Sequence, residues 1–544
     1  MSSACAPAQA ARPAPEPCDP RWPGWREKWT PRVLWFLFVY FGLCLIALDH
    51  LPNTLWDPRL RQVTIVIGAL GIWRYSWWLT HAVRAFIYGR VAYPRMRRQA
   101  ETVWQSGWRP RHLHFLVTTF REHRETTEKV MLGICREVRA CGVPATLWLG
   151  SSEPKDEGII ADFLDRCASD LDLTLRIVRQ NRPGKRMALG LALRAMSRSV
   201  LHRDDVVVFM DGDFIAAPGA LARCLPLFRL YPDLHALTTD EEVACEAPQW
   251  ARIWLSLRFA QRRITMQSHA LSGRVLTLTG RMSVFRAEHV TKLAFIRMLE
   301  ADYLDHWLWG RFRFLSGDDK STWFYLLQQG ARMLYVPDAF GYTVEVFEGK
   351  GYRRMALNFQ RWSGNMLRNG ARAIALGPRR MPFFIWWCLV DQRIAMWTML
   401  VAPMLAVSSA ILHGAEYLIA YIILTAVSRM LLSLFLFMHA RKIYVSWPFF
   451  LYLNQMVNAA VKVHAVSRLA HQRWANRGDQ RLDFDVPGLA TTSRNLMASY
   501  VTAVYVACLL IGVIHSAALI ELPSAAILGS FWFELAQLLP GRIS

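Results

Sequence analysis

The sequence lacks paired cysteines. Its ten cysteines form no Cys-x-x-Cys pair and show no repeated spacing. Structural zinc sites and disulfide frameworks need such spacing, so we expect neither. The chain also lacks helix-turn-helix, zinc-finger and RNP patterns, which leaves nucleic-acid binding without support despite the many arginines. We therefore expect reduced thiols and no nucleic-acid partner.

Acidic residues are scarce and apolar residues are abundant. The 544-residue chain has 42 acidic against 64 basic residues, a formal net charge of +22, and 53% hydrophobic residues. Its length exceeds that of one typical domain. Basic residues beside apolar runs are typical of cytoplasmic loops that contact anionic membrane lipids. We therefore expect a soluble catalytic unit joined to membrane segments.

The amino-terminal region contains two apolar runs. Residues 1–32 are rich in Pro, Ala and Arg without a signal-peptide pattern, so we expect a disordered cytoplasmic tail there. The next segment, 33–88, has two runs long enough for the ~20 helical residues that cross a bilayer. A basic segment follows and predicts a return to the cytoplasm. Arg74 lies inside the second run, where a functional role and an interfacial position beside Trp and Tyr both stay open.

Apolar character returns in the carboxyl-terminal third. We expect interfacial and transmembrane helices over 381–466, a cytoplasmic basic segment over 467–496, a transmembrane helix over 497–514 and a periplasmic tail over 515–544. The stretch 445–466 is ambiguous, because a crossing there would move the following arginines out of the cytoplasm. We favour an interfacial or re-entrant segment.

Short β-type runs alternate with amphipathic stretches between residues 100 and 375. This alternation predicts an α/β domain with a mainly parallel sheet. The expected strands are 112–119, 145–150, 174–178 and 206–210, with a crossover helix over 128–140. Such a sheet binds ligands at the carboxyl ends of its strands. Residues at those ends are therefore the first candidates for a functional site.

An Asp-Gly-Asp turn follows the strand that ends at Met210. Its carboxylates, Asp211 and Asp213, can share a hard divalent cation, Mg²⁺ or Mn²⁺, which would neutralise a leaving diphosphate. Asp-Gly is also a common turn pair. Its place directly after an apolar strand favours the metal-binding interpretation.

A second acidic motif, Ser-Gly-Asp-Asp-Lys, precedes an apolar helical stretch. Glycosyl transfer needs a carboxylate to remove the proton of the attacking hydroxyl, and Asp319 is our candidate base, with Asp318 beside it. Either aspartate would equally serve as a helix N-cap, and on this motif alone the cap is the more common use.

Basic and aromatic residues complete the candidate site. In the third motif, Asn-Phe-Gln-Arg-Trp, the guanidinium of Arg361 can bind phosphate oxygens and the indole of Trp362 can stack on a sugar ring. Such pairs beside membranes are also common interfacial anchors. Lys185 and Arg186 follow a strand and can reach a diphosphate, although a solvated basic turn is an equally good interpretation.

In this order, and between two membrane regions, the motifs resemble the processive family of inverting glycosyltransferases that includes the hyaluronan, chitin, cellulose and mannuronan synthases. The resemblance covers about residues 30 to 470. It implies a cytoplasmic, Rossmann-like GT-A domain inserted between the transmembrane helices of a polytopic protein. It also implies metal and nucleotide binding by the Asp-Gly-Asp motif, a base in the Gly-Asp-Asp motif, and nucleotide and acceptor contacts from Arg361 and Trp362.

The chain departs from the family pattern at two places. The glutamine of the family's Gln-x-x-Arg-Trp motif falls on Asn358. The family also has an acidic residue just after the second strand, where this chain has Gly150 and two serines. Glu153 or Asp156 would have to substitute for it.

Several stretches are similar to the mannuronan synthase branch, the catalytic subunits of bacterial alginate polymerases. They are 305–310, 316–322, 364–369 and 391–393. The likeness implies GDP-mannuronate as donor, a growing β-1,4-linked polymer, a bacterial inner membrane, a cyclic-di-GMP-binding co-polymerase and a periplasmic export assembly. Arg281 and Lys320 would then bind sugar carboxylates. A UDP-sugar synthase of the hyaluronan, chitin or cellulose type, or a transport or scaffold subunit with a degenerate transferase domain, stays an alternative.

Overall fold

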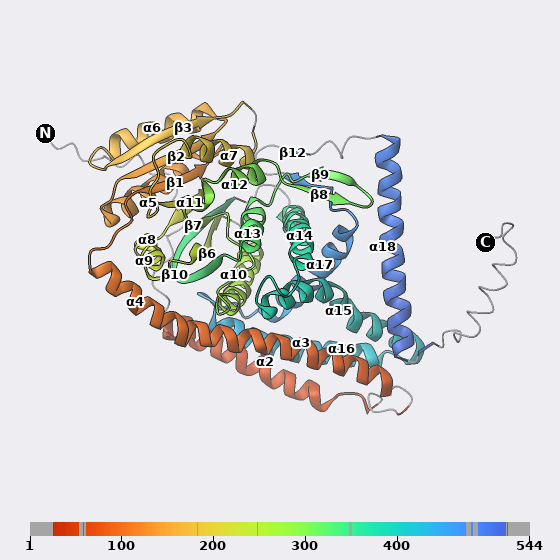
Figure 1. Ribbon diagram of the computed structural model, residues 1–544. Helices are drawn as coiled ribbons and strands as arrows, with labels where there is room; N and C mark the ends of the chain where they lie inside the picture. Colours follow the sequence, from red (N-terminus) through yellow and green to blue (C-terminus); the bar gives the residue numbers. More distant parts are fainter. Residues whose placement is uncertain are drawn as a thin grey trace.

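The structure, a computed structural model, contains an α/β domain and a set of long helices. It describes residues 25–520 apart from 54–57, 59–60, 182, 247, 347–350, 475–479, 482–487 and 518. The α/β domain lies to one side, and helices from both ends of the chain run beneath and beside it (Figure 1). Of the expected tails at 1–32 and 515–544, residues 1–24, 518 and 521–544 fall outside the described residues, whereas 25–28, 31–32 and 515–516 are helical.

One eight-stranded mixed sheet has the order β3-β2-β1-β4-β7-β6-β10-β5. The strands are β1 Leu113–Thr118, β2 Ala145–Ser151, β3 Leu173–Arg179, β4 Val206–Asp211, β5 Phe214–Ala216, β6 Leu234–Glu246, β7 Met282–Arg286 and β10 Arg332–Val346. Strands β1 to β4 pair in parallel, as do β6 and β10. β7 is antiparallel to β4 and β6, and β5 to β10. The expected strands and the mainly parallel sheet are confirmed.

Helices pack around this sheet (Figure 1). They are α5 Arg124–Cys141, α6 Pro154–Cys167, α7 Lys185–Met196, α8 Ala220–Cys224, α9 Pro226–Leu230, α10 Gln249–Ala270, α11 Ala287–Val290, α12 Leu293–Glu300 and α13 Asp318–Gln328, with a hairpin of β8 Tyr303–His306 and β9 Gly310–Arg313. The crossover helix α5 shows the sequence logic. Val130, Ile134 and Val138 repeat at helical spacing and are buried, and Gly142 ends the helix in the left-handed conformation, with φ of 63°.

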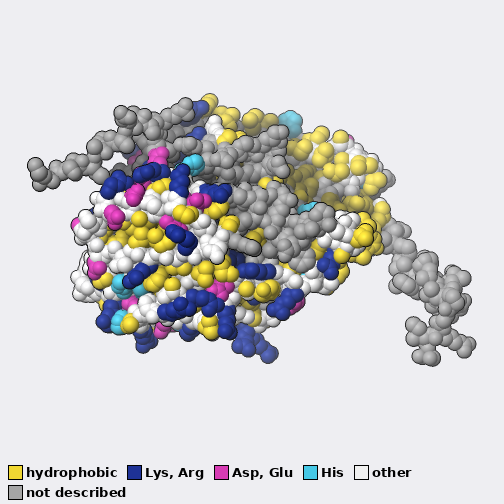
Figure 2. Space-filling model, turned by 90° about the horizontal axis from the view of Figure 1, so that it is seen from above, with side chains coloured by type: hydrophobic (Ala, Val, Ile, Leu, Met, Phe, Trp, Pro, Cys, Tyr) yellow, Lys and Arg dark blue, Asp and Glu magenta, His cyan; other side chains and the backbone are white. Residues whose placement is uncertain are grey.

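Four helices of the described residues are long and apolar enough to cross a membrane. They are α2 Pro31–Asp49, α15 Phe383–His413, α16 Glu416–Met438 and α18 Leu489–Ser516. Large apolar side chains on them are exposed, such as Phe38 at 71% and Ile411 at 78%. Seen from above, basic side chains are spread over the α/β domain, whereas an apolar surface gathers at the other end (Figure 2). Exposed apolar surface of this extent is typical of a membrane contact.

The remaining elements connect the two regions. They are α1 Trp25–Lys28, α3 Arg61–Ile87, a π-helical turn Tyr88–Ala92, α4 Tyr93–Gln105, α14 Gly351–Ala375, α17 Trp447–Val466, β11 Arg473–Trp474 and β12 Gln480–Arg481. α3, the second predicted crossing, is not among the four apolar helices. The region 381–466, where the sequence predicts interfacial and transmembrane helices, begins with α15, one continuous helix from Phe383 to His413.

Arg74 of α3 forms an ion pair with Asp391 of α15, with 2.7 Å between Nη2 and Oδ1. The pair is largely but not fully buried, so removing one partner, which costs about 3–5 kcal/mol in a fully buried pair, should cost less here. We therefore expect Arg74→Met to lower the thermal unfolding midpoint of the detergent-purified protein. The double variant Arg74→Met/Asp391→Leu should recover most of the loss. Equal destabilisation by the single and double variants would contradict this.

Candidate active site

The Asp-Gly-Asp turn is held against the end of β1. The Gly212 amide donates to the Thr118 carbonyl at 3.0 Å. A Cβ atom at residue 212 would lie 2.8 Å from that carbonyl oxygen and 3.2 Å from the Thr119 Cβ, so a larger residue would push the turn away. The glycine of this motif therefore fixes where Asp211 and Asp213 lie, beyond its general use in turns.

Lys185 joins the two acidic motifs. It is the first residue of α7, and its Nζ lies 2.7 Å from Asp211 Oδ1 and 2.9 Å from Asp318 Oδ2. Gly280 faces the same cluster, since a Cβ there would lie 3.2 Å from the Lys185 Nζ. The structure thus brings together three residues that the sequence proposed separately, at the carboxyl edge of β4.

The electrostatics of this cluster follow from burial and from the shared lysine. Burial and the neighbouring carboxylate of Asp318 raise the pKa of Asp211, against the effect of Lys185. Burial also acts to raise the pKa of Asp318, but the Lys185 ammonium outweighs it and holds that pKa below the usual range. Burial would lower the pKa of Lys185, yet the two carboxylates raise it. The cluster therefore holds a charged lysine between carboxylates of unequal proton affinity.

Asp319 lies at the start of α13, beside the shared lysine. Gly317 is the N-cap, with φ of 86° and no side-chain capping bond, so neither aspartate caps the helix through its side chain. A helix N-terminus favours negative charge. Burial, followed by the charge of Asp318, nevertheless raises the pKa of Asp319. A carboxylate with a raised pKa is a better proton acceptor than an ordinary aspartate.

The third motif lies on α14, where Trp362 packs in an aromatic cluster. Its ring stacks on that of Trp254 of α10, with centroids 6.4 Å apart and an interplanar angle of 28°. The Arg361 guanidinium donates to the Asn358 side chain at 3.4 Å. The family glutamine is thus replaced by a buried asparagine that contacts the motif's own arginine.

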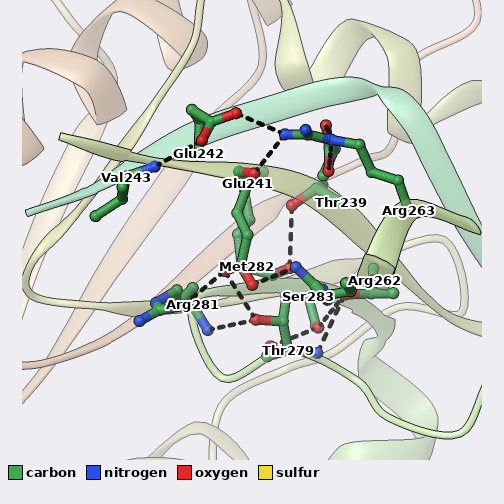
Figure 3. Close-up of polar contacts among 12 residues, drawn as sticks. Thr239, Glu241, Glu242, Val243, Arg262, Arg263, Thr279, Arg281, Met282 and Ser283 are labelled. Atoms are coloured by element: carbon green, nitrogen blue, oxygen red, sulfur yellow. Dashed lines mark hydrogen bonds and ion pairs between the residues drawn. The ribbon is translucent and has the colours of Figure 1, made fainter. Parts of the chain in front are cut away.

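Glu241 of β6 positions Arg281. Its carboxylate accepts hydrogen bonds from Arg262 of α10, from Arg281 at 3.2 Å and from the Thr279 hydroxyl at 3.5 Å (Figure 3). The neighbouring Arg263 is buried between Asp240 and Glu242, at 2.8 Å from each. Arg281 therefore reaches the edge of the site from a rigid polar network.

Three other candidates are placed differently. Arg186 is buried and donates to the Ser321 hydroxyl and the Met298 carbonyl, each at 3.1 Å. Its predicted contact with the nucleotide stays a prediction. Asp156 is buried and accepts from the Thr119 hydroxyl at 2.8 Å at the end of β1, whereas Glu153 pairs with the exposed Arg121. Asp156 is therefore the better substitute for the missing acidic residue.

Sequence reasoning missed Glu241 and two cations, Arg258 of α10 and Lys462 of α17, that lie near the aromatic cluster. One signal was available for Glu241. The run Asp240-Glu241-Glu242 lies inside the strand β6, where three consecutive acidic residues are unusual without basic partners. Arg258 and Lys462 gave no such signal, because the contact of α10 and α17 with the third motif is a tertiary contact that the local sequence does not show.

Comparisons with known proteins find one family model and two related sequences. The family model described as "Glycosyltransferase like family 2" matches residues 110–365. Glycosyltransferase alg8 of Pseudomonas syringae pv. tomato (strain ATCC BAA-871 / DC3000) is 37% identical over 476 residues, which cover 87% of this chain and 96% of that protein. Glycosyltransferase alg8 of Azotobacter vinelandii is 37% identical over 485 residues, covering 88% and 97%.

Among solved structures, the mannosyltransferase PcManGT from Pyrobaculum calidifontis, in complex with GDP-Man and Mn²⁺, is similar at 17% identity. The match covers 70% of this chain and 98% of that chain, with a TM-score of 0.45.

The mixed sheet, the acidic turn at the end of β4 and the family match define a glycosyltransferase with the GT-A fold. The expected fold class and enzyme class are confirmed. Because the match to the two Alg8 proteins extends over almost their whole length, the chain belongs to the Alg8 glycosyltransferase family.

Proposed function

We propose that this glycosyltransferase polymerises mannuronate from GDP-mannuronate into a β-1,4-linked chain, as in alginate biosynthesis. The observation that carries the proposal is the 37% identity to Alg8 glycosyltransferases over most of the chain. It is supported by the convergence of Asp211, Lys185 and Asp318 at one sheet edge. Arg281 and Lys320 add positive charge near this edge, which suits a sugar that carries a carboxylate.

In the proposed reaction Asp319 accepts the proton of the acceptor hydroxyl as that oxygen attacks the anomeric carbon of the donor. The attack comes from the face opposite the departing GDP, so the configuration inverts and no covalent enzyme intermediate forms. Arg361 binds the negative charge that develops on the diphosphate. Trp362 stacks on the terminal sugar of the acceptor and holds its hydroxyl towards the base.

Asp211 and Asp213 are the residues that would hold a divalent cation. Carboxylate oxygens are the ligands that Mg²⁺ and Mn²⁺ prefer, and the fixed turn presents two of them one residue apart. The Asp211 carboxylate already holds a cationic group, Lys185, which indicates that positive charge is stable at this place. When bound, the metal would supply positive charge to the leaving diphosphate.

We also propose the setting of this reaction. The apolar helices would place the protein in a bacterial inner membrane as a multi-pass protein, with the α/β domain in the cytoplasm. The product would cross the membrane as it grows. A cyclic-di-GMP-binding co-polymerase and a periplasmic export assembly are the proposed partners.

Nucleotide binding tests the donor without requiring any partner protein. We expect the detergent-purified chain to bind GDP more tightly than UDP, and to do so only with Mg²⁺ or Mn²⁺ present, as measured by calorimetry or thermal shift. Asp213→Asn is the matched variant, and it should lose the metal dependence. GDP-mannuronate would then be assayed for polymer formation.

The two other outcomes of the binding experiment would change the proposed function. Tighter binding of UDP would transfer the assignment to a hyaluronan, chitin or cellulose type of synthase. Binding of neither nucleotide, with a folded protein, would argue for a transport or scaffold role.

A further inference from the structure

Arg258 of α10 lies against the ring of Trp362, the residue proposed to bind the acceptor sugar. Its guanidinium carbon is 4.4 Å from the ring centroid of Trp362, 5.0 Å from that of Phe359 and 5.3 Å from that of Trp254. Three aromatic rings therefore surround one cation. Cation–π contacts stabilise it in part, but none of these rings provides a hydrogen-bond acceptor for the guanidinium.

Lys462 of α17 lies next to this cluster. Val457 and Val461 of the same helix pack against the buried cluster that contains Trp254 and Phe359, so α17 contacts the group of rings that holds Arg258. Burial, followed by the charge of Arg258, lowers the pKa of Lys462 to about 8. Burial and the charge of Arg281 lower the pKa of Arg258 to about 10.

Neither cation has an acidic partner among the residues that the structure describes. The nearby acids are engaged elsewhere, because Glu241 holds Arg262 and Arg281, and Asp391 holds Arg74. Both side chains are half-buried, and charges that are withdrawn from water in proteins are normally paired. Two neighbouring cations without anions are costly, and the cost falls when an anion binds between them.

We infer that Arg258 and Lys462 form a binding site for the carboxylates of the growing polymer, next to the sugar that stacks on Trp362. The site lies where α10, α14 and α17 pack together. Lys320, which donates to the Leu276 carbonyl at 2.6 Å, contributes positive charge between this pair and the base. The inference rests on the proposed function in that the polymer must be anionic.

A cationic pair of this kind would select the polymer by charge after transfer, separately from the selection of the donor by its nucleotide. A carboxylate on each successive sugar would pair with Arg258 and Lys462 in turn. A neutral polymer would leave both half-buried cations unpaired, which disfavours it. The residues therefore act as specificity determinants and have no part in the proton transfer.

The test compares two oligosaccharides of the same length on the full-length protein in detergent. One is a β-1,4-linked oligomannuronate, and the other is the same oligomer with its carboxyl groups reduced to alcohols. We expect wild type to bind the oligomannuronate at least tenfold more tightly, with an affinity that falls as salt increases. Lys462→Met and Arg258→Gln should each remove most of this preference. Lys462→Arg should retain it, and Lys442→Met, at an exposed lysine, serves as the control.

GDP binding, measured on the same samples, separates the possible failures. If GDP binding is normal but both oligomers bind equally well in wild type, the carboxylate site is wrong and the proposed donor stands. If the preference exists but neither variant changes it, the carboxylates bind elsewhere. If wild type prefers UDP and the reduced oligomer, the proposed function itself is wrong.

Discussion

Asp319→Asn is expected to abolish polymer formation and to leave GDP binding unchanged. The amide has nearly the shape of the carboxylate but cannot accept the proton of the acceptor hydroxyl. General base catalysis contributes about 10²–10⁴-fold to a rate, so a processive enzyme that repeats the transfer many times should yield no measurable polymer. Incorporation of labelled mannuronate in membranes that contain all partner proteins would measure the loss.

The matched control for this variant is Asp162→Asn, which makes the same change at an exposed position of α6. Its polymer yield should equal that of wild type. Both variants should bind GDP with the affinity of wild type, because the proposed nucleotide contacts come from other residues. Polymer formation by Asp319→Asn at the wild-type rate would remove Asp319 as the base and direct attention to Asp318.

Lys185→Met is expected to destabilise the nucleotide-free protein strongly and to make its stability depend on a divalent cation. Lys185 lies between Asp211 and Asp318, and its loss leaves two nearby carboxylates facing each other. Leaving buried charge without its partner costs about 3–5 kcal/mol, part of which protonation of Asp211 would offset. A bound Mg²⁺ or Mn²⁺ would replace the missing charge and restore about 2.7 kcal/mol at a concentration 100-fold above its Kd.

Thermal unfolding with and without Mn²⁺ measures this effect. In wild type the lysine already balances the carboxylates, so added Mn²⁺ should raise the unfolding midpoint less than in the variant. Lys155→Met, at an exposed position of α6, should unfold like wild type. An unfolding midpoint of Lys185→Met that equals that of wild type and ignores Mn²⁺ would show that the lysine does not neutralise these carboxylates.

The α/β domain was predictable because its signals are local. The apolar residues of β1, β2 and β4 are nearly continuous and are bounded by turns, so a parallel sheet follows from the order of runs alone. The acidic motifs were recognisable because each directly follows a strand or precedes a helix. The same dependence on local signals explains why the full extent of the helix at 383–413 was not predicted. Its aromatic first turns resemble an interfacial segment when taken alone, and only packing shows that they continue into the apolar part.

Long-range pairing was not predictable. Nothing around Lys185 indicates that its ammonium would meet Asp318, which is 133 residues away in the chain, because that contact needs α7 and α13 to converge on β4. Arg74 had two open interpretations for the same reason, and its partner Asp391 lies in a different helix. Arg258 and Lys462 are candidates only because α10, α14 and α17 pack together.

The helix α14 carries Trp362, which is proposed to bind the acceptor sugar, and it also contacts the turn that precedes the proposed base, Asp319. Trp362 and Asn365 are three residues apart, which is about 4.5 Å along a helix axis. Asn365 accepts from the Ser316 hydroxyl at 3.0 Å, and a Cβ at Gly317 would lie 2.8 Å from its side chain, so Asn365 is wedged against the turn that begins α13. The ring of Trp362 and the base Asp319 are therefore held at a constant distance from each other. The polymer lengthens by one sugar at a time and must move past Trp362 in each elongation cycle. The polymer and the donor therefore move, while the distance from Trp362 to Asp319 stays the same for every sugar added.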